Sequence, residues 1–184
     1  MAKRSPQTDP FDLSRHEYEL VLRRYVKAWP RWADEPAHFE NRARAFMCVG
    51  DLEGALRSWE QAAALRRVKP LAPGMHPNND LYGVTLFLLG RADDAVSFFR
   101  SEAEDITAGR ITYTDAAGGV GPGLYMWYMA WTIKDTTGEA FAKAYLRRRL
   151  RRTIASAFPG PVAAYLLDRL PERDLIYSIF GVDS

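Results

Sequence analysis

The feature that most constrains this chain is a pair of short helical patterns joined by a glycine, in residues 39–65. The stretch reads FENRARAFMCVGDLEGALRSWEQAAAL, and Gly50 stands between two runs whose apolar residues recur every three or four positions. Apolar residues at that spacing predict amphipathic helices, and glycine is favoured in the left-handed position that follows a helix. The stretch therefore predicts a helical hairpin.

The same arrangement returns further along the chain. Two segments share a glycine, an alanine five residues later and an aromatic residue four further on: Gly50, Ala55 and Trp59, and then Gly90, Ala95 and Phe99. Ala28 and Ala62 share a spacing of 34 residues (62 − 28 = 34). Self-similarity at a fixed period is the signature of a repeat array. We therefore expect helical hairpins stacked along the chain.

At these residues the chain resembles the tetratricopeptide repeat (TPR) family, whose period is 34 residues. The resemblance rests on Phe39, Ala43, Phe46, Gly50, Ala55, Trp59 and Ala62, and on Tyr82, Gly83, Leu86, Gly90, Ala95 and Phe99. A third hairpin follows from Pro122, and Asp135-Thr136-Thr137-Gly138 stands where its turn glycine is expected. The register of this third hairpin stays open by about two residues.

The resemblance implies an all-α fold. It is a right-handed α–α superhelix of about three TPR-like helical hairpins, with an N-terminal half-repeat helix and a two-helix C-terminal cap. Residues 158–176, FPGPVAAYLLDRLPERDLI, are similar to the end of bacterial TPR lipoproteins and their cytoplasmic relatives. Because the N-terminus has no lipid-acceptor cysteine, we expect no membrane anchor.

Local signals place the boundaries of these elements. Residues 1–13 are polar and predict a flexible tail, which leaves residues 14–184 as a single repeat domain. Ser14 and Glu17 form a capping box that begins the first helix, and Pro30 ends it at Trp29. Residues 81–89 are apolar on nearly every side, so they predict a central buried helix.

In the second half of the chain, the sequence signals that mark helix boundaries are weaker. A first helix over residues 124–134 and a partner over about 138–157 make the third hairpin, with Thr136 and Glu139 as a capping box. Residues 107–123 form a long connector that could gate the groove, with a short extended stretch at 111–113. Gly160-Pro161 and Pro171 each begin a helix of the cap.

Composition is that of a soluble globular protein. Hydrophobic residues make up 47% of the chain and charged residues 26%, which are ordinary values. A net charge of +2 gives no strong case for nucleic acid as the partner. The longest apolar runs are shorter than the ~20 residues of a membrane span, and no apolar signal-peptide region is present. We therefore expect a cytoplasmic protein.

Catalytic and metal-binding patterns do not emerge. His16, His38 and His76 are far apart and match no metal motif. Cys48 lies between apolar residues on a predicted helix and indicates an inert thiol. The glycine run at 118–123 lacks the Lys-Ser/Thr ending of a phosphate loop, so it indicates a hinge. We expect a non-enzymatic protein with no cofactor and no metal.

The concave surface of such an array is the predicted binding site. It is built mainly from the first helix of each hairpin, and tyrosine and tryptophan are enriched at binding hot spots. We predict a groove that binds a segment of a partner protein. Its candidate residues are Glu40, Arg44, Met47, Asp80, Val84, Phe87, Tyr125, Tyr128 and Met129.

Two alternatives stay open from the sequence alone. One is a small molecule bound beneath the loop at 106–123, beside the aromatic helix that follows it. The other is an anionic partner bound by a basic patch, although cations also suit a helix C-terminus. That patch consists of Arg147, Arg148, Arg149, Arg151 and Arg152. Self-association is open as well, because a missing half-repeat leaves an apolar face uncovered.

Overall fold

The computed structural model describes residues 15–72, 74–75, 80–112, 118–151, 158–172 and 174–175. These residues are all-helical apart from two strands of two residues each. The chain divides into two compact units, an N-terminal unit (Met1–Pro70) and a C-terminal unit (Leu71–Ser184). The predicted tail at 1–13 and the capping residue Ser14 lie outside the described residues.

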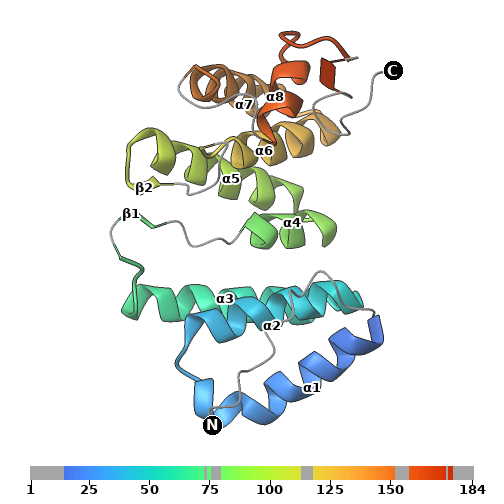
Figure 1. Ribbon diagram of the computed structural model, residues 1–184, viewed down its shortest axis with the longest axis vertical. Coiled ribbons are helices and arrows are strands. Elements are labelled where there is room, and N and C mark those ends of the chain that lie inside the picture. The colour runs from blue at the N-terminus through green and yellow to red at the C-terminus, as the bar shows by residue number, and fades with distance from the viewer. Residues whose placement is uncertain are drawn as a thin grey trace. The chain divides into compact units, whose positions relative to one another are not determined.

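The described part of the N-terminal unit contains three helices, labelled in Figure 1: α1 (Arg15–Trp32), α2 (Pro36–Val49) and α3 (Leu52–Val68). Helix α1 continues past Pro30 to Trp32, so the predicted end at Trp29 is wrong. The residue before a proline is only biased away from the α region, and here the helical backbone continues through Trp29 and Pro30. Helix α2 packs against both α1 and α3.

The predicted hairpin of residues 39–65 is confirmed as α2 and α3. Gly50 has φ +84°, its N–H donates to the Met47 carbonyl, and the Asp51 N–H donates to the Phe46 carbonyl. This pair of bonds is the Schellman motif, which requires a left-handed residue at the position of Gly50. Ala43 and Ala55 are both fully buried, so small side chains bring the two helices close together.

The C-terminal unit begins with a second hairpin. Its helices are α4 (Asp80–Leu88) and α5 (Ala92–Thr107), with Gly90 in the left-handed position between them. The connectors on either side of this hairpin meet in a short parallel ladder, because β1 (Gly74–Met75) pairs with β2 (Ile111–Thr112) (Figure 1). The predicted extended stretch is confirmed at β2, whereas its partner strand has no counterpart in the sequence signals.

A third hairpin and one short helix complete the described part of this unit. They are α6 (Gly121–Thr132), α7 (Thr136–Arg149) and α8 (Gly160–Leu166). Helix α7 ends at Arg149 rather than near residue 157. The second helix of the predicted cap is described only at 171–172 and 174–175, where the Leu175 N–H donates to the Pro171 carbonyl at 3.1 Å.

The turn of the third hairpin has Lys134, not glycine, in the left-handed position, with φ +61°. The Lys134 and Asp135 N–H groups donate to the Trp131 and Ala130 carbonyls, which repeats the bonds at Gly50. Asp135 caps α7 with its own carboxylate, so the predicted capping box of Thr136 and Glu139 is wrong. The structure thereby fixes the register that the sequence leaves open.

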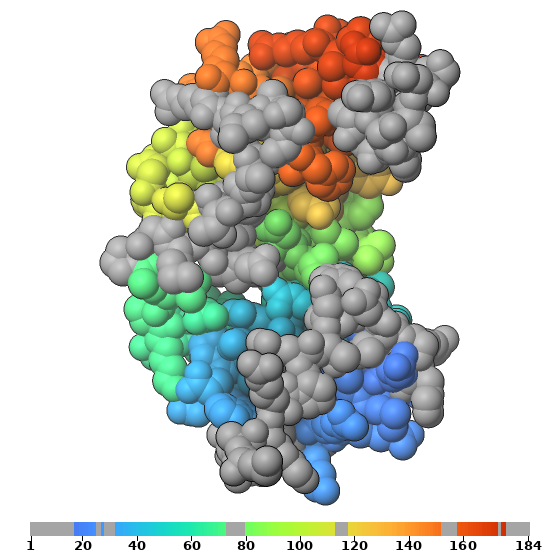
Figure 2. Space-filling view, viewed as in Figure 1, coloured from blue at the N-terminus to red at the C-terminus, as the bar shows by residue number. Residues whose placement is uncertain are grey.

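Helices of the C-terminal unit form two layers. Helices α4 and α6 lie in one layer and α5 and α7 in the other, since α5 contacts α4, α6 and α7. A core under α8 joins the layers where α5, α7 and the start of α6 converge. Figure 2 shows α7 and α8, in orange and red, covering this end of the unit. The core consists of Ala103, Ile106, Val120, Tyr145, Leu146, Ala163 and Leu167.

Candidate functional site: an aromatic face and a grooved layer

The predicted groove residues fall in both units. Glu40, Arg44 and Met47 lie on α2, whereas the other six lie on α4 and α6 of the C-terminal unit.

On α2, the candidate residues hold the hairpin together. Glu40 is 9% exposed and pairs with Arg66 of α3, with 2.9 Å between the carboxylate and Nη2. Arg44 donates to the Asn41 side chain and lies over the Trp59 ring, 5.7 Å from its centroid. Met47 is half-buried. Because its carboxylate is committed to Arg66, Glu40 is corrected from a groove residue to a residue that links the two helices.

On α4 and α6, four of the candidates come together. Asp80 lies near the start of α6, since a Cβ atom built on Gly121 comes 3.9 Å from Asp80 Oδ2. One or two turns further along, the rings of Phe87 and Tyr128 are 6.0 Å apart between centroids. Burial, together with the negative charge of Asp80, raises the pKa of the Tyr125 phenol above its ordinary value. The two helices thus run parallel with facing side chains.

Val84 and Met129 have different positions on these helices. Val84 is half-buried and lies one turn before Phe87, on the same stripe of α4. Met129 is 2% exposed and packs in the core with Met126 and Ala130. The exposed stripe of α6 passes through Tyr125 and Tyr128 instead, so Met129 is corrected from a surface residue to a core residue.

Sequence reasoning did not select Trp131 as a site residue, and the structure adds it. Trp131 is 58% exposed and Tyr128 is 52% exposed, and their ring centroids are 6.5 Å apart. We call Phe87, Tyr125, Tyr128 and Trp131 the aromatic face. Leu88, at the end of α4, is 55% exposed, so α4 is not buried on every side as the sequence predicts. One sequence signal could have indicated this exposure. A short helix that is apolar on every side cannot bury all of its sides in a unit of only two layers.

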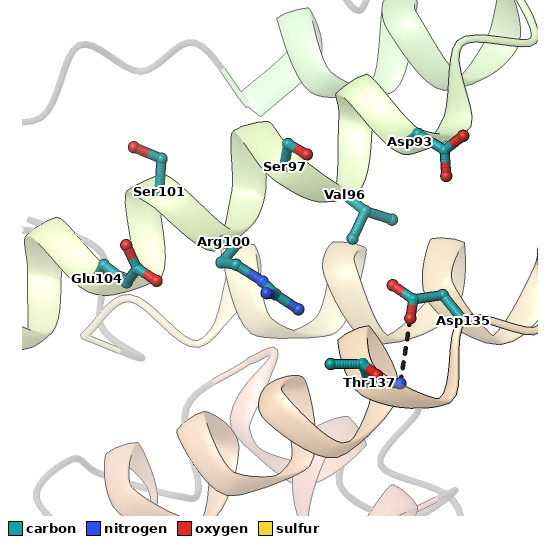
Figure 3. A pocket seen from close by; sticks show the side chains of 8 residues that line it. All are labelled: Asp93, Val96, Ser97, Arg100, Ser101, Glu104, Asp135 and Thr137. Carbon is teal, nitrogen blue, oxygen red and sulfur yellow. Dashed lines mark hydrogen bonds between the residues drawn. The ribbon is translucent and has the colours of Figure 1, made fainter.

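The second layer carries two adjacent hollows between α5 and α7. The first has a volume of about 340 Å³ and is shown in Figure 3, where Asp93, Arg100 and Asp135 surround one depression. Asp135 Oδ1 accepts hydrogen bonds from the N–H groups of Thr137 and Gly138, at 3.1 and 3.0 Å. The full lining is Asp93, Val96, Ser97, Arg100, Ser101, Glu104, Asp135 and Thr137.

The second hollow shares Glu104 with the first and has a volume of about 370 Å³. Its α7 side is a single helical stripe, and its α5 side includes the first residues of the predicted loop at 106–123. Tyr128 does not line either hollow. Neither hollow therefore corresponds to the small-molecule site expected beside the aromatic helix. The lining is Glu104, Thr107, Ala108, Arg110, Phe141, Ala144, Tyr145 and Arg148.

The predicted basic patch divides into exposed and structural residues. Arg147, Arg148 and Arg151 are exposed, whereas Arg149 is half-buried and donates to the Gly118 carbonyl. Tyr145, one turn earlier on α7, donates its hydroxyl to the Gly119 carbonyl at 2.5 Å. Arg149 is therefore corrected from a patch residue to a residue that tethers the glycine run at 118–123, which we call the glycine loop. Arg152 lies outside the described residues.

Metal-binding clusters and membrane-crossing helices have no counterpart in the described ranges. Within them, no group of three or more His, Cys, Asp and Glu side chains could hold a metal ion. Nor does any helix there combine the length and the apolar character needed to cross a membrane. His38 is buried on α2, and this burial, followed by the charge of Arg42, lowers the pKa of its imidazole. Cys48 is half-buried and makes no disulfide.

Comparison with protein-family models, with curated proteins and with solved structures finds no match to this chain.

Proposed function

We propose that this protein is a non-enzymatic adaptor that binds an apolar segment of a partner protein on the aromatic face. The observation that carries the proposal is the exposure of large rings on α4 and α6, the first helices of two successive hairpins. Large apolar side chains exposed together mark interaction surfaces more often than single ones do. Tyrosine and tryptophan also combine apolar area with a polar tip.

The rings of this face support one another before any partner arrives. Phe87 contacts Tyr128, Tyr128 contacts Trp131, and Trp131 stacks on Trp127 with 6.3 Å between centroids. Tyr125 stacks on the fully buried Phe99 at 5.1 Å. Side chains that are already ordered lose less conformational entropy on binding, a cost of about 0.5–1.5 kcal/mol for each flexible side chain. The face therefore suits recognition of a segment at low entropic cost.

We further propose that the hairpins stack as a right-handed TPR-like superhelix and that the protein acts in the cytoplasm. Three turns with the same backbone hydrogen bonds, at Gly50, Gly90 and Lys134, support the repeat architecture. An experimental structure of the full chain tests the superhelix, since a left-handed or non-superhelical arrangement of the hairpins contradicts it. Cell fractionation tests the location.

Site-specific photo-crosslinking tests the binding proposal. The crosslinker p-benzoylphenylalanine takes the place of Tyr128 in the full chain, and a matched protein carries it in place of Tyr165 on α8. Tyr165 is also an exposed tyrosine, but it lies outside the aromatic face. We expect a partner peptide to be crosslinked from position 128 only, and mass spectrometry of the adduct identifies the segment.

A synthetic copy of that segment then provides the decisive measurement. The double variant Tyr128→Ser, Trp131→Ser should bind it at least about tenfold more weakly, because aromatic hot-spot residues contribute about 2 kcal/mol or more. The single variant Tyr165→Ser should bind it as the unchanged protein does. Equal affinity of all three proteins contradicts the proposal, and so does a crosslink from position 128 to a second copy of this chain alone.

A further inference from the structure

The hollow between the C-terminal halves of α5 and α7 is a second surface that the aromatic face does not explain. It lies in the layer of second helices, whereas the aromatic face belongs to α4 and α6. We propose that this hollow, which we call the basic hollow, docks an acidic segment of a partner protein through one apolar side chain and its flanking carboxylates. This proposal stands without the first, because it uses other residues and another layer.

Half of the residues that line the basic hollow are apolar or aromatic. Phe141, Ala144 and Tyr145 come from one face of α7, and Ala108 comes from the end of α5. The Tyr145 hydroxyl donates to the Gly119 carbonyl, so its ring is held in place. At about 370 Å³ the hollow falls at the lower end of the range for sites that accommodate ligands. It therefore offers room for an apolar side chain.

The end of α7 beside the hollow carries arginines that form no pair with the described residues. Arg148 lines the hollow, and Arg147 and Arg151 are exposed on the same end of α7. With the residues that the structure describes, these three side chains form neither an ion pair nor a hydrogen bond. The other arginines nearby differ, since Arg110 pairs with Asp105 at 2.5 Å and Arg149 donates to Gly118.

A helix C-terminus attracts cations, and this dipole accounts for part of the charge on α7. It does not account for an apolar hollow directly beside that charge. The combination favours a ligand that has an apolar group and carboxylates within one short segment, because arginine pairs well with carboxylates. An acidic peptide with an apolar side chain has this chemistry.

Charge within the hollow distinguishes a peptide from a nucleic acid or a membrane. Glu104 lines the hollow and Asp105 is beside Arg110, so a continuous line of phosphates meets repulsion there. A peptide can present a backbone N–H to Glu104 and still place carboxylates near Arg148. A flat lipid surface, by contrast, cannot enter a recess.

Fluorescence anisotropy with defined probes tests the proposal on the full chain. The probe is a labelled synthetic peptide of aspartate and glutamate with one central phenylalanine, and the comparison probes are the same peptide with alanine at that position and a single-stranded RNA of equal charge. We expect the phenylalanine peptide to bind at least about tenfold more tightly than either comparison probe. Equal binding of the peptide and the RNA overturns the proposal, as does the absence of peptide binding.

Two variants with matched controls locate the site. Arg148→Glu should weaken binding of the phenylalanine peptide at least about tenfold, because a charged hydrogen bond is replaced by repulsion. Arg67→Glu, on α3, makes the same change in net charge and should leave binding unchanged. Ala144→Trp fills the hollow and should abolish the preference for phenylalanine, whereas Ala64→Trp on α3 should not. All four positions are exposed, so the variants are expected to fold.

Circular dichroism confirms folding of each variant before binding is measured. If Arg67→Glu weakens binding as much as Arg148→Glu does, overall charge explains the interaction and the basic hollow is not its site. If Ala144→Trp preserves the phenylalanine preference, the apolar side chain does not enter the hollow. Either result overturns the proposal.

Discussion

The turn of the α2–α3 hairpin and the turn of the α6–α7 hairpin have the same backbone with different residues. Both place one residue in the left-handed region and satisfy the last carbonyls of the first helix with the same two hydrogen bonds. Both begin the second helix with an aspartate, Asp51 or Asp135, which accepts from the N–H of Gly54 or Gly138. They differ at the left-handed residue, which is Gly50 in one and Lys134 in the other.

This difference shows which residues of the turns recur from one hairpin to the next. Gly50 identifies the first turn in the sequence, but the residues that the first and third turns share are the capping aspartate and the glycine three positions later. The second turn has Gly90 and lacks a side-chain cap, since the side chain of Arg91 does not cap α5. All three turns share a left-handed residue and the pair of backbone hydrogen bonds. A search for turn glycines therefore misses the third hairpin.

The largest expected effect tests the glycine that the two turns share. A Cβ atom on Gly138 meets Asp135 Oδ2 at 2.3 Å and the Ala130 Cβ at 3.0 Å, and on Gly54 it meets Asp51 Oδ2 at 2.5 Å. We expect Gly54→Ala and Gly138→Ala each to lower the free energy of unfolding by about 1–3 kcal/mol. Urea denaturation measures the total, and hydrogen exchange by mass spectrometry assigns it to a unit.

The control for this prediction is the same substitution at an open position in a helix. Gly121→Ala introduces a Cβ atom that, chain neighbours apart, comes closest to Asp80 Oδ2 at 3.9 Å. Alanine favours a helix over glycine by up to about 1 kcal/mol, whereas Pro122 disfavours a helical residue with a Cβ atom before it, so this variant should lose less stability than Gly54→Ala or Gly138→Ala. A neutral result at Gly54 or Gly138 contradicts the close contacts described for them.

A smaller effect tests the shared cap. Asp51→Ala and Asp135→Ala should each lower the free energy of unfolding by about 1 kcal/mol, the usual cost of removing an N-cap side chain. Arg91→Ala serves as the reference, because the side chain of Arg91 does not cap α5 and its ion pair with Asp94 is exposed, which is worth little. If the three variants lose the same stability, the aspartates do not distinguish these turns.

The smallest effect tests the difference between the turns, and the two substitutions have opposite signs. Lys134→Gly should stabilise the protein by about 0.5–1 kcal/mol, because a left-handed conformation strains a residue with a side chain. Gly50→Ala should destabilise it by a similar amount, and strain alone is responsible because a Cβ atom there has open space around it. Thermal unfolding of the two variants beside the unchanged protein checks both signs.

Much of the fold could be predicted from local signals. The starts of α3 at Leu52 and α5 at Ala92 follow directly from the turn glycines before them, and Pro122 lies in the first turn of α6 as expected. Such signals act within a few residues of the boundary that they set. The predicted end of α7 was wrong because the arginine run continues the helical pattern without a stop signal.

The site was harder to predict because it depends on contacts between distant residues. Glu40 lies on the expected stripe of α2, yet it pairs with Arg66, 26 residues away. Arg149 belongs to a run of similar arginines, and its contact with Gly118, 31 residues away, distinguishes it from Arg148. Helical periodicity identifies which side of a helix is buried, but it does not show which partner a polar group on the border will choose.

The tether between α7 and the glycine loop has a consequence for how this unit comes apart. Tyr145 and Arg149 reach back across their own hairpin to the residues just before α6. In a simple repeat array each repeat contacts only its neighbours, so a terminal helix can be removed with limited loss. Here one end of the hairpin is held by its turn and the other by the contacts of Tyr145 and Arg149. We therefore expect α6 and α7 to unfold and refold as one cooperative unit.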